Sequence, residues 1–392
     1  MMAKRRRSLP AKFPRRVLIA PDKFKGTLTS EQAARAIERG LRRAWPGVKT
    51  TRFTLTDGGD GFVDFMVRQT KGKIRYADTI DAAGRPIRAK WGVLGDKKTA
   101  VIGLPEASGI AHLPKRLRNP EKTTNLGTGN LLAFAAEQEF EEILIGLGGS
   151  ATTEGGISLA APIGYIYTDK DHRQVLPIGA NLLKIAKILP SAHHFKSRFV
   201  VATDVENPLF GPRGAAVQFG PQKGADSVMV KRLDKGLRHL ARIAKRDLGY
   251  DFANEPGAGA AGGCGYGLMT FFNARREDGF QLVRRLTKLD ALIRAHDLVI
   301  TGEGAFDQTS LLGKAPSQLA ELARQFKRPA WALCGRVDFP RGRKPPFARL
   351  AGLSTPENPG PKVESLTSAQ HAKRLEKLAY EVARGCISEG KV

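Results

Sequence analysis

Apolar and polar positions alternate along the start of the chain in the pattern of strands followed by helices. Residues 17–20 form a short apolar run, and a Thr-x-x-Gln capping box at 29–32 predicts the start of a helix. Apolar residues then recur at helical spacing until Trp45-Pro46-Gly47, where we expect the helix to end. Phe53 and Leu55 alternate with polar residues as in a strand, and the glycine-rich segment 57–61 precedes a second apolar helix. The β-loop-α unit therefore repeats.

The middle of the chain has a different pattern. From about residue 76 to residue 104 it is rich in predicted strands, with a turn at Gly84-Arg85-Pro86. Further elements follow by periodicity: helices at 130–139 and 227–247, and strands at 143–147 and 199–203. After residue 290 the β-α rhythm returns, with strands at 297–301 and 330–334 around a helix at 313–325.

The two ends of the chain thus share a rhythm that the middle interrupts. This predicts an α/β protein of two domains, in which residues 17–75 and 290–392 build one doubly wound domain and residues 76–289 form an inserted second domain. We expect residues 1–16, a basic low-complexity tail, to be disordered.

Composition narrows the class of protein. The chain has 392 residues, of which 41% are hydrophobic, and no apolar run reaches the length of a membrane-spanning helix. The apolar stretch after the basic N-terminus is too short for a signal peptide, so we expect a soluble, cytoplasmic protein. Three distant cysteines without a CxxC pair support neither a disulfide framework nor a structural zinc site.

The formal net charge of +26 raises nucleic acid as a partner. Seven of the cations lie in the acid-free N-terminal tail, and the others are scattered over predicted helix surfaces. Neither a nucleic-acid-binding motif nor basic stretches interleaved with aromatic residues are present. The distribution therefore argues against a dedicated nucleic-acid role and leaves an anionic substrate or a generally basic proteome as explanations.

Three predicted strands run directly into glycine-rich polar loops, at 20–26, 146–152 and 301–304. Ligands of open α/β sheets bind at the carboxyl ends of strands, where glycine lets backbone N–H groups approach an anion. Each loop alone is equally well explained by tight turns and close helix packing. Together they favour a phosphate-binding site.

Other reaction classes are poorly supported. Gly146-x-Gly148-x-x-Ala151 fits the dinucleotide fingerprint, but a second match at 257–262 follows no strand, so an NAD-dependent oxidoreductase rests on one weak signal. The sequence has no Gly-Lys-Ser/Thr of a P-loop, no Gly-x-Ser-x-Gly elbow and no HExxH metal motif.

Charged residues accompany the glycine-rich loops. The carboxylates Asp57, Asp60, Asp204, Glu303 and Asp307 follow predicted strands, where they can hold a metal ion or accept a hydroxyl proton. Any one of them is more commonly a turn or helix-cap residue. Lysines in comparable loops can neutralise phosphate; they are Lys23, Lys25, Lys223 and Lys314.

Seven segments, taken in order, resemble the glycerate kinase family of the bacterial type-I kind. The matching segments are 20–26, 57–61, 127–129, 146–156, 204–224, 257–263 and 301–304. The resemblance implies a Rossmann-like domain formed by both chain ends, an inserted α/β domain, and an active site in the cleft between them. It also implies transfer of the γ-phosphoryl group of ATP, with Mg²⁺, to D-glycerate, with 2-phosphoglycerate favoured as the product.

The resemblance also assigns roles to positions of this sequence. Catalytic roles fall to Lys23, Asp204 and Asp307, of which Asp204 or Asp307 would bind Mg²⁺ or take the hydroxyl proton. ATP phosphates would be held by Gly148, Gly149, Ser150, Thr152 and Lys25. Substrate-binding roles fall to Asp57, Asn207, Lys223, Glu303 and Arg336.

The sequence departs from the family pattern at several motif positions. Ala305 stands where the family usually has an arginine, and Arg336, where the family has serine, is a candidate to supply that charge. Thr153-Glu154 replaces the family's Asn-Asp, and Asn130 replaces a glutamate. Two alternatives therefore stay open: a kinase of a related hydroxy or sugar acid, and an inactive protein that binds nucleotide or organic acid, with the basic tail anchored to nucleic acid. The sequence does not indicate the oligomeric state.

Overall fold

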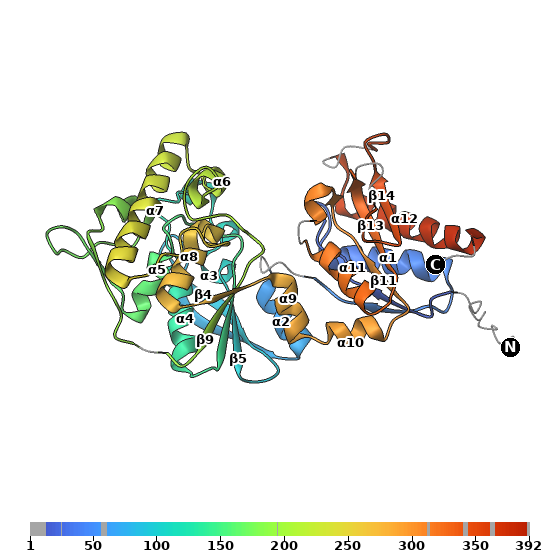
Figure 1. Ribbon diagram of the computed structural model, residues 1–392, viewed down its shortest axis with the longest axis horizontal. Helices are drawn as coiled ribbons and strands as arrows, with labels where there is room; N and C mark the ends of the chain where they lie inside the picture. The colour runs from blue at the N-terminus through green and yellow to red at the C-terminus, as the bar shows by residue number, and fades with distance from the viewer. Residues whose placement is uncertain are drawn as a thin grey trace. The chain divides into compact units, whose positions relative to one another are not determined.

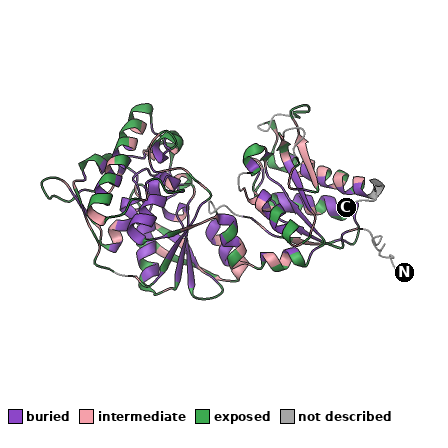
Figure 2. Ribbon diagram, viewed as in Figure 1, coloured by how far each residue is buried: buried purple, intermediate pink, exposed green. Residues whose placement is uncertain are grey.

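The computed structural model describes residues 13–24, 26–55, 61–193, 195–311, 314–339, 344–360 and 365–389. The chain divides into two compact units (Figure 1). The terminal unit joins both ends of the chain, residues 1–56 and 283–392, and the insertion unit spans residues 57–282. Each unit has its own hydrophobic core of buried strands and helix faces (Figure 2).

The terminal unit is built on one sheet of six parallel strands. Its order is β12-β13-β11-β1-β2, with β14 also paired to β13. The strands are β1 (Arg16–Ile19), β2 (Lys49–Arg52), β11 (Leu298–Thr301), β12 (Ala305–Phe306), β13 (Ala330–Val337) and β14 (Arg349–Ser354). Its helices are α1 (Ser30–Ala44), α10 (Leu289–Arg294), α11 (Ala315–Gln325) and α12 (Ser368–Glu389), with the 3₁₀ turn η6 (Gln308–Leu311). Because Val17 pairs with Leu298, the expectation that both chain ends form one α/β domain is confirmed.

The insertion unit is a mixed α/β domain on a sheet in the order β10-β9-β6-β5-β4-β3. The strands are β3 (Lys73–Ile80), β4 (Pro86–Val93), β5 (Thr99–Gly103), β6 (Glu142–Gly146), β9 (Arg198–Ala202) and β10 (Arg275–Glu277), and a hairpin pairs β7 (Ile166–Thr168) with β8 (Lys187–Leu189). The strands β3, β4 and β5 are antiparallel, whereas β5, β6, β9 and β10 run parallel.

Helices of the insertion unit pack on both the sheet and one another. They are α2 (Phe62–Thr70), α3 (Pro105–Ser108), α4 (Leu126–Glu137), α5 (Ile157–Ala160), α6 (Ala215–Phe219), α7 (Ser227–Leu248) and α8 (Ala260–Phe272), with short 3₁₀ turns that include η5 (Pro221–Lys223). Helix α9 (Gly279–Leu286) spans the boundary between the two units. The helix predicted over 227–247 thus ends one residue later than expected, and the helix predicted over 130–139 begins four residues earlier.

Local signals in the sequence explain several element ends. Thr29 caps α1 as predicted, with its side chain accepting from the backbone N–H of Gln32 and the Gln32 side chain accepting from the N–H of Thr29. The helix ends at Trp45, which is fully buried. Phe53, expected within a strand, follows β2 and is buried by packing instead.

The division between the units differs from the sequence expectation. The chain crosses near residues 57 and 283, rather than near 76 and 289. Helix α2 packs against β4 and β5 and so belongs to the insertion unit. The sequence predicts α2 as part of the terminal unit because it follows the same β-loop-α pattern. An amphipathic pattern shows that one face of a helix is buried, but it does not show which sheet buries that face.

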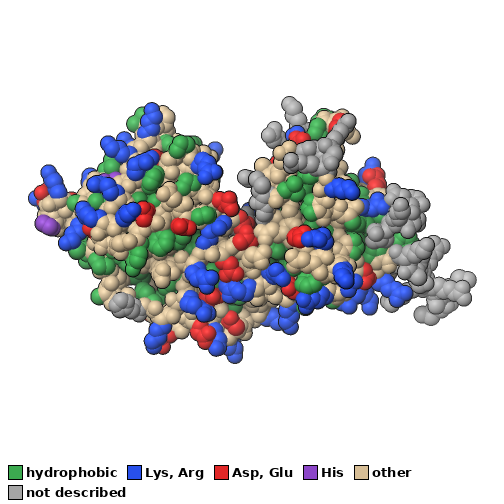
Figure 3. All heavy atoms as spheres, viewed as in Figure 1, with side chains coloured by type: hydrophobic (Ala, Val, Ile, Leu, Met, Phe, Trp, Pro, Cys, Tyr) green, Lys and Arg blue, Asp and Glu red, His purple; other side chains and the backbone are tan. Residues whose placement is uncertain are grey.

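On the face shown in Figure 3, charged residues are spread widely, and lysines and arginines lie beside carboxylates in many places. Lys98–Glu141 and Arg324–Glu321 are ion pairs between exposed side chains. In the described part of the chain, no helix combines the length and the apolar character needed to span a bilayer.

Candidate functional site

The connections of the terminal sheet create a switch point between β1 and β11. From β1 the chain continues through α1 to β2 on one side, whereas from β11 it continues towards β13 on the other. Open α/β sheets bind ligands beyond the carboxyl ends of the strands at such a point. The residues that follow these two strands include Asp22 and Glu303, and the Asp22 N–H donates to the Gly302 carbonyl at 2.8 Å. This edge of the sheet is therefore the candidate site of the terminal unit.

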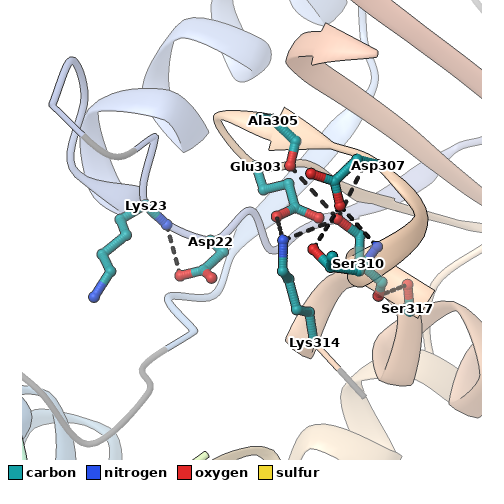
Figure 4. A network of polar contacts seen from close by, with 9 residues as sticks. Asp22, Lys23, Glu303, Ala305, Asp307, Ser310, Lys314 and Ser317 are labelled. Carbon is teal, nitrogen blue, oxygen red and sulfur yellow. Dashed lines mark hydrogen bonds and ion pairs between the residues drawn. The ribbon is translucent and has the colours of Figure 1, made fainter. Parts of the chain in front are cut away.

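Glu303 is the buried acid of this site. Its residue exposure is 6%, and Lys314 Nζ donates to Oε2 at 3.3 Å and to Ser310 Oγ at 3.1 Å (Figure 4). No group in the described residues donates a hydrogen bond to Glu303 Oε1. Burial raises the pKa of Glu303, the Lys314 ammonium opposes that rise, and the nearby Asp22 carboxylate adds to it. The carboxyl group is thus a candidate proton acceptor.

Asp307 is held ionised beside this acid. Its Oδ1 accepts from the Thr309 N–H at 2.8 Å and from the Thr309 hydroxyl at 2.5 Å. The hydrogen bond from the Thr309 hydroxyl lowers the pKa of Asp307. The Ser310 hydroxyl accepts from the Asp307 N–H at 3.2 Å and so joins Asp307 to the Lys314 cluster.

Two further predicted residues, Lys23 and Arg336, lie in the same unit. Lys23 is exposed, its N–H donates to Asp22 Oδ1 at 2.7 Å, and its side chain extends away from Asp22 (Figure 4). Arg336 is directly opposite Ala305 in the pairing of β12 and β13, and its exposed guanidinium binds Asp338 at 2.8 Å. The Arg336 cation therefore lies on β13, directly opposite Ala305 of β12, the position where the family pattern has an arginine.

The insertion unit has a second candidate site at the carboxyl ends of β6 and β9. Residues 147–156, which we call the glycine loop, follow β6, and Asp204 follows the neighbouring strand β9. The Gly149 carbonyl accepts from the Ile110 N–H at 2.7 Å, and Gly149 is exposed with a φ of 57°. The first helix after the loop, α5, begins only at Ile157. The loop is therefore not the strand-to-helix turn of a dinucleotide fingerprint.

Lys223 lies behind the glycine loop rather than on the surface. Its exposure is 2%, and its Nζ donates to the Thr152 carbonyl at 2.5 Å and to Ser150 Oγ at 3.1 Å. Burial lowers its pKa to about 8. The Ser150 hydroxyl also bonds to the Ala261 carbonyl at 3.0 Å. The hydroxyls expected to face phosphate thus face inward, and the lysine expected to bind substrate is bonded to the loop.

A buried polar network around Asn125 continues from the same loop. The Asn125 side-chain amide donates to Thr152 Oγ1 at 2.6 Å, to Cys264 Sγ at 3.1 Å and to the Glu154 carboxyl. The Ser158 N–H donates to the other oxygen of Glu154 at 3.1 Å. Burial raises the pKa values of both Glu154 and Cys264. This network connects α4, α5 and α8 to the glycine loop.

Asp204 and Asn207 lie on the segment after β9. Asp204 is exposed, and its Oδ1 accepts from the Gly279 N–H, at the start of α9, at 2.8 Å. The Asn207 side chain donates to the Arg213 carbonyl at 2.7 Å, and its own carbonyl accepts from the Gly259 N–H at 2.8 Å. Asn207 therefore has a clear part in holding its loop together.

The structure thus sorts the predicted residues into two groups, one in each unit. Lys23, Glu303, Asp307 and Arg336 belong to the terminal unit, and the glycine loop, Asp204, Asn207 and Lys223 belong to the insertion unit. Three predicted residues, Lys25, Asp57 and Asp60, lie outside the described residues.

The described residues contain no cluster of three His, Cys, Asp or Glu side chains that could hold a metal ion. Mg²⁺ in phosphoryl-transfer sites is usually held by one or two carboxylates together with substrate phosphates and water. The exposed carboxylate of Asp204 and the ionised carboxylate of Asp307 each fit that requirement singly.

Sequence reasoning missed how these residues are connected. Asn125, Glu154 and Cys264 were not predicted as site residues, yet all three meet in the network behind the glycine loop. Ser310 was missed as well, although it bonds to both Asp307 and Lys314. The sequence indicated Lys314 as a cation in a glycine-containing loop, but no local sequence pattern predicts its ion pair with Glu303.

Comparisons with known proteins agree with the motif resemblance. Residues 17–386 match the model of the glycerate kinase family. A glycerate kinase from Halalkalibacterium halodurans is 38% identical, over 94% of this chain and 97% of its own length. A glycerate 2-kinase from Escherichia coli is 38% identical, over 82% of this chain and 85% of its own length.

A solved structure adds the fold. The crystal structure of a protein from Salmonella typhimurium LT2, provisionally named glycerate kinase 2, superposes with a TM-score of 0.78 at 32% identity. The alignment covers 96% of this chain and 99% of the Salmonella chain, so both units are shared. The resemblance seen in the seven motifs is confirmed, and the chain belongs to the glycerate kinase family.

Proposed function

We propose that the protein is a kinase that transfers the γ-phosphoryl group of ATP to a hydroxyl group of D-glycerate. Family membership supports the reaction class, and the name of the E. coli relative, glycerate 2-kinase, supports 2-phosphoglycerate as the product. The observation that carries the proposal is the cluster at the switch point of the terminal sheet. There the buried carboxyl group of Glu303, one oxygen of which accepts no hydrogen bond from the described residues, lies beside the ammonium of Lys314.

The glycine loop is the proposed site for ATP phosphates. Gly148 is half-buried and Gly149 is exposed at the carboxyl edge of the insertion sheet, where backbone N–H groups suit an anion. The hydroxyls of Ser150 and Thr152 are bonded inside the protein, so we assign them to the shape of the loop. Lys25 remains a proposed phosphate ligand.

The reaction brings two anions together, so cations must offset their charge. We propose that Lys23 and Arg336 serve this role toward the glycerate carboxylate or the phosphates, because both are exposed at strand ends of the terminal unit. Asp57 and Asn207 remain proposed contacts of the substrate.

Proton transfer from the acceptor hydroxyl requires a base. Glu303 fits because burial raises its pKa and because one of its oxygens has no donor among the described residues. Asp204 of the insertion unit and Asp307 of the terminal unit are alternative proposed Mg²⁺ ligands, and Mg²⁺ would offset the charge that develops on the transferring phosphoryl group. Because Asp307 keeps a lowered pKa, its carboxylate stays ionised at neutral pH.

The test measures ADP release by the purified protein with MgATP and a panel of acids: D-glycerate, L-glycerate, glycolate, tartronate and erythronate. We expect turnover with D-glycerate, with D307N and E303Q each reduced by at least a hundredfold, and ³¹P NMR to show phosphate on the 2-hydroxyl. K235M, which changes an exposed lysine of α7, is the matched control and should keep full activity. If only another acid supports turnover, that acid replaces D-glycerate as the proposed substrate. ATP binding without turnover on any acid would contradict the kinase proposal.

A further inference from the structure

Lys223 is an unusual residue to find in the interior of this protein. It closes the 3₁₀ turn η5 and is 2% exposed, although lysine is almost never fully buried without a partner. No hydrogen bond described for its amine goes to a carboxylate; its acceptors are the Thr152 carbonyl and the Ser150 hydroxyl. Both acceptors belong to the glycine loop.

The backbone around the amine is shaped to leave room for it. Ala261, Gly262 and Gly263 have φ values of 54°, 75° and 93°, so the chain makes a left-handed turn just before the regular part of α8. A Cβ atom on Gly262 would lie 1.9 Å from the Thr152 oxygen and 2.8 Å from Lys223 Nζ. Only glycine fits there, because it has no side chain and tolerates a positive φ. The close approach packs the turn against the amine and the loop together.

The same turn also bonds directly to the glycine loop. The Gly155 N–H donates to the Gly262 carbonyl at 3.1 Å, and the Ser150 hydroxyl donates to the Ala261 carbonyl at 3.0 Å. The loop is thus held from its inner side by Lys223 and by the turn, while Gly149 stays exposed on its outer side.

Two titratable groups face Lys223, the Glu154 carboxyl from the loop and the Cys264 thiol from α8. Both are buried, and burial raises their pKa values, which favours their neutral forms. Burial likewise disfavours the ammonium form of Lys223 and brings its pKa to about 8. An ammonium in such surroundings costs stability that an apolar side chain would not. An anion bound on the outer side of the loop would stabilise that charge.

We propose that Lys223 is a positioning residue for phosphate binding: from inside the protein it fixes the glycine loop and places a positive charge beneath Gly148 and Gly149. It does not touch the substrate. The inference rests on the proposed function, in which this loop holds the phosphates of ATP. It replaces the expectation that Lys223 binds glycerate.

The test is calorimetric titration of MgATP into the full chain and into K223M, with K235M as the control. We expect K223M to bind ATP at least tenfold more weakly and K235M to bind as the wild type does. The KM for glycerate should be unchanged in K223M, because the residue acts on the loop and not on the acceptor. The thermal midpoint of K223M should change little, because loss of the hydrogen bond to the Thr152 carbonyl opposes the gain from replacing a buried amine with an apolar side chain.

Proton linkage gives a readout that a purely structural role would not move. Because an anion on the loop favours the ammonium form, wild-type binding at pH 8 to 8.5 should take up a fraction of a proton, measured in buffers of different ionisation enthalpy. That uptake should vanish in K223M, and wild-type affinity should fall as the pH rises from 7 to 9.5. If K223M does not fold, the wild-type measurements alone decide the question.

Unchanged ATP affinity in K223M, or binding without proton uptake at pH 8, would overturn the inference while leaving the proposed function intact. A wild-type protein that binds no ATP would overturn both.

Discussion

Gly262→Ala gives a direct test of the left-handed turn behind the glycine loop. The added methyl would lie 1.9 Å from the Thr152 carbonyl oxygen, whereas real Cβ contacts are essentially never below 3.0 Å. The turn and the loop must therefore separate by at least about 1.1 Å, the difference between these two distances. The displaced carbonyl is the acceptor of the Lys223 hydrogen bond.

The expected cost has three parts. Alanine at a left-handed φ costs about 1 kcal/mol, and overpacking a tight interior costs about 1 to 3 kcal/mol. Weakening a buried hydrogen bond from a charged donor adds about 1 kcal/mol or more. The total is about 4 kcal/mol, and at about 2 to 4 °C per kcal/mol for a unit of this size the transition should shift down by about 10 °C.

Gly249→Ala is the matched control. Gly249 ends α7 in the same unit with a φ of 82°, and nothing lies within 4 Å of its added Cβ. It should cost only the backbone strain of about 1 kcal/mol, or about 3 °C. Differential scanning calorimetry of the two variants and the wild type measures both shifts. Equal shifts would show that the close approach at Gly262 does not constrain the fold, and the reasoning about the turn would be wrong.

Four further predictions concern the terminal unit. Thr29→Ala should lower its stability by about 1 kcal/mol through loss of the N-cap, whereas Thr29→Ser should keep it, as chemical denaturation can measure. Because burial raises the pKa of Glu303, the folded protein holds this proton more tightly than the unfolded chain does. Glu303→Gln should therefore equal the wild type in stability below about pH 4 and become more stable than the wild type as the pH rises to 7. A stability difference that stays constant with pH would refute this expectation. Lys314→Met should raise the pKa of Glu303 further and move the acid limb of the pH–rate profile to higher pH. An unmoved limb would show that Lys314 does not set the pKa of the catalytic base. Thr309→Val should return the pKa of Asp307 toward its ordinary value, visible as an upward shift in an NMR titration of that carboxyl.

Local patterns in the sequence were sufficient for much of the fold. The capping box at Thr29 and the turn signal at Trp45 located both ends of α1, because capping and chain reversal depend on neighbouring residues. The return of the β-α rhythm after residue 290 predicted that both chain ends share a sheet, which the pairing of Val17 with Leu298 confirms. The first boundary between the units was misplaced by about twenty residues, because α2 is equally amphipathic whichever sheet it covers.

The candidate site could be predicted only in part. Glycine and carboxylate motifs at strand ends pointed to Asp204, Glu303, Asp307 and the glycine loop, and the family resemblance supplied the reaction class. The groups that each side chain contacts could not be predicted from the sequence. Lys223 and Arg336 are both basic residues that the sequence offered as substrate contacts, yet the Lys223 amine is enclosed behind the glycine loop and the Arg336 guanidinium is exposed on β13, opposite Ala305.

By itself, then, the sequence determined the elements, their α/β order and the family, because helix and strand periodicity, caps and contiguous motifs are properties of neighbouring residues. Only the tertiary structure decided that Lys314 pairs with Glu303 and that Lys223 is buried against Thr152, more than seventy residues earlier in the chain. Such pairings depend on strand order and on close backbone approach, as at Gly262, and no local pattern records them. The chemistry of the site follows from these pairings, since burial and a neighbouring charge together set the proton affinity of each group.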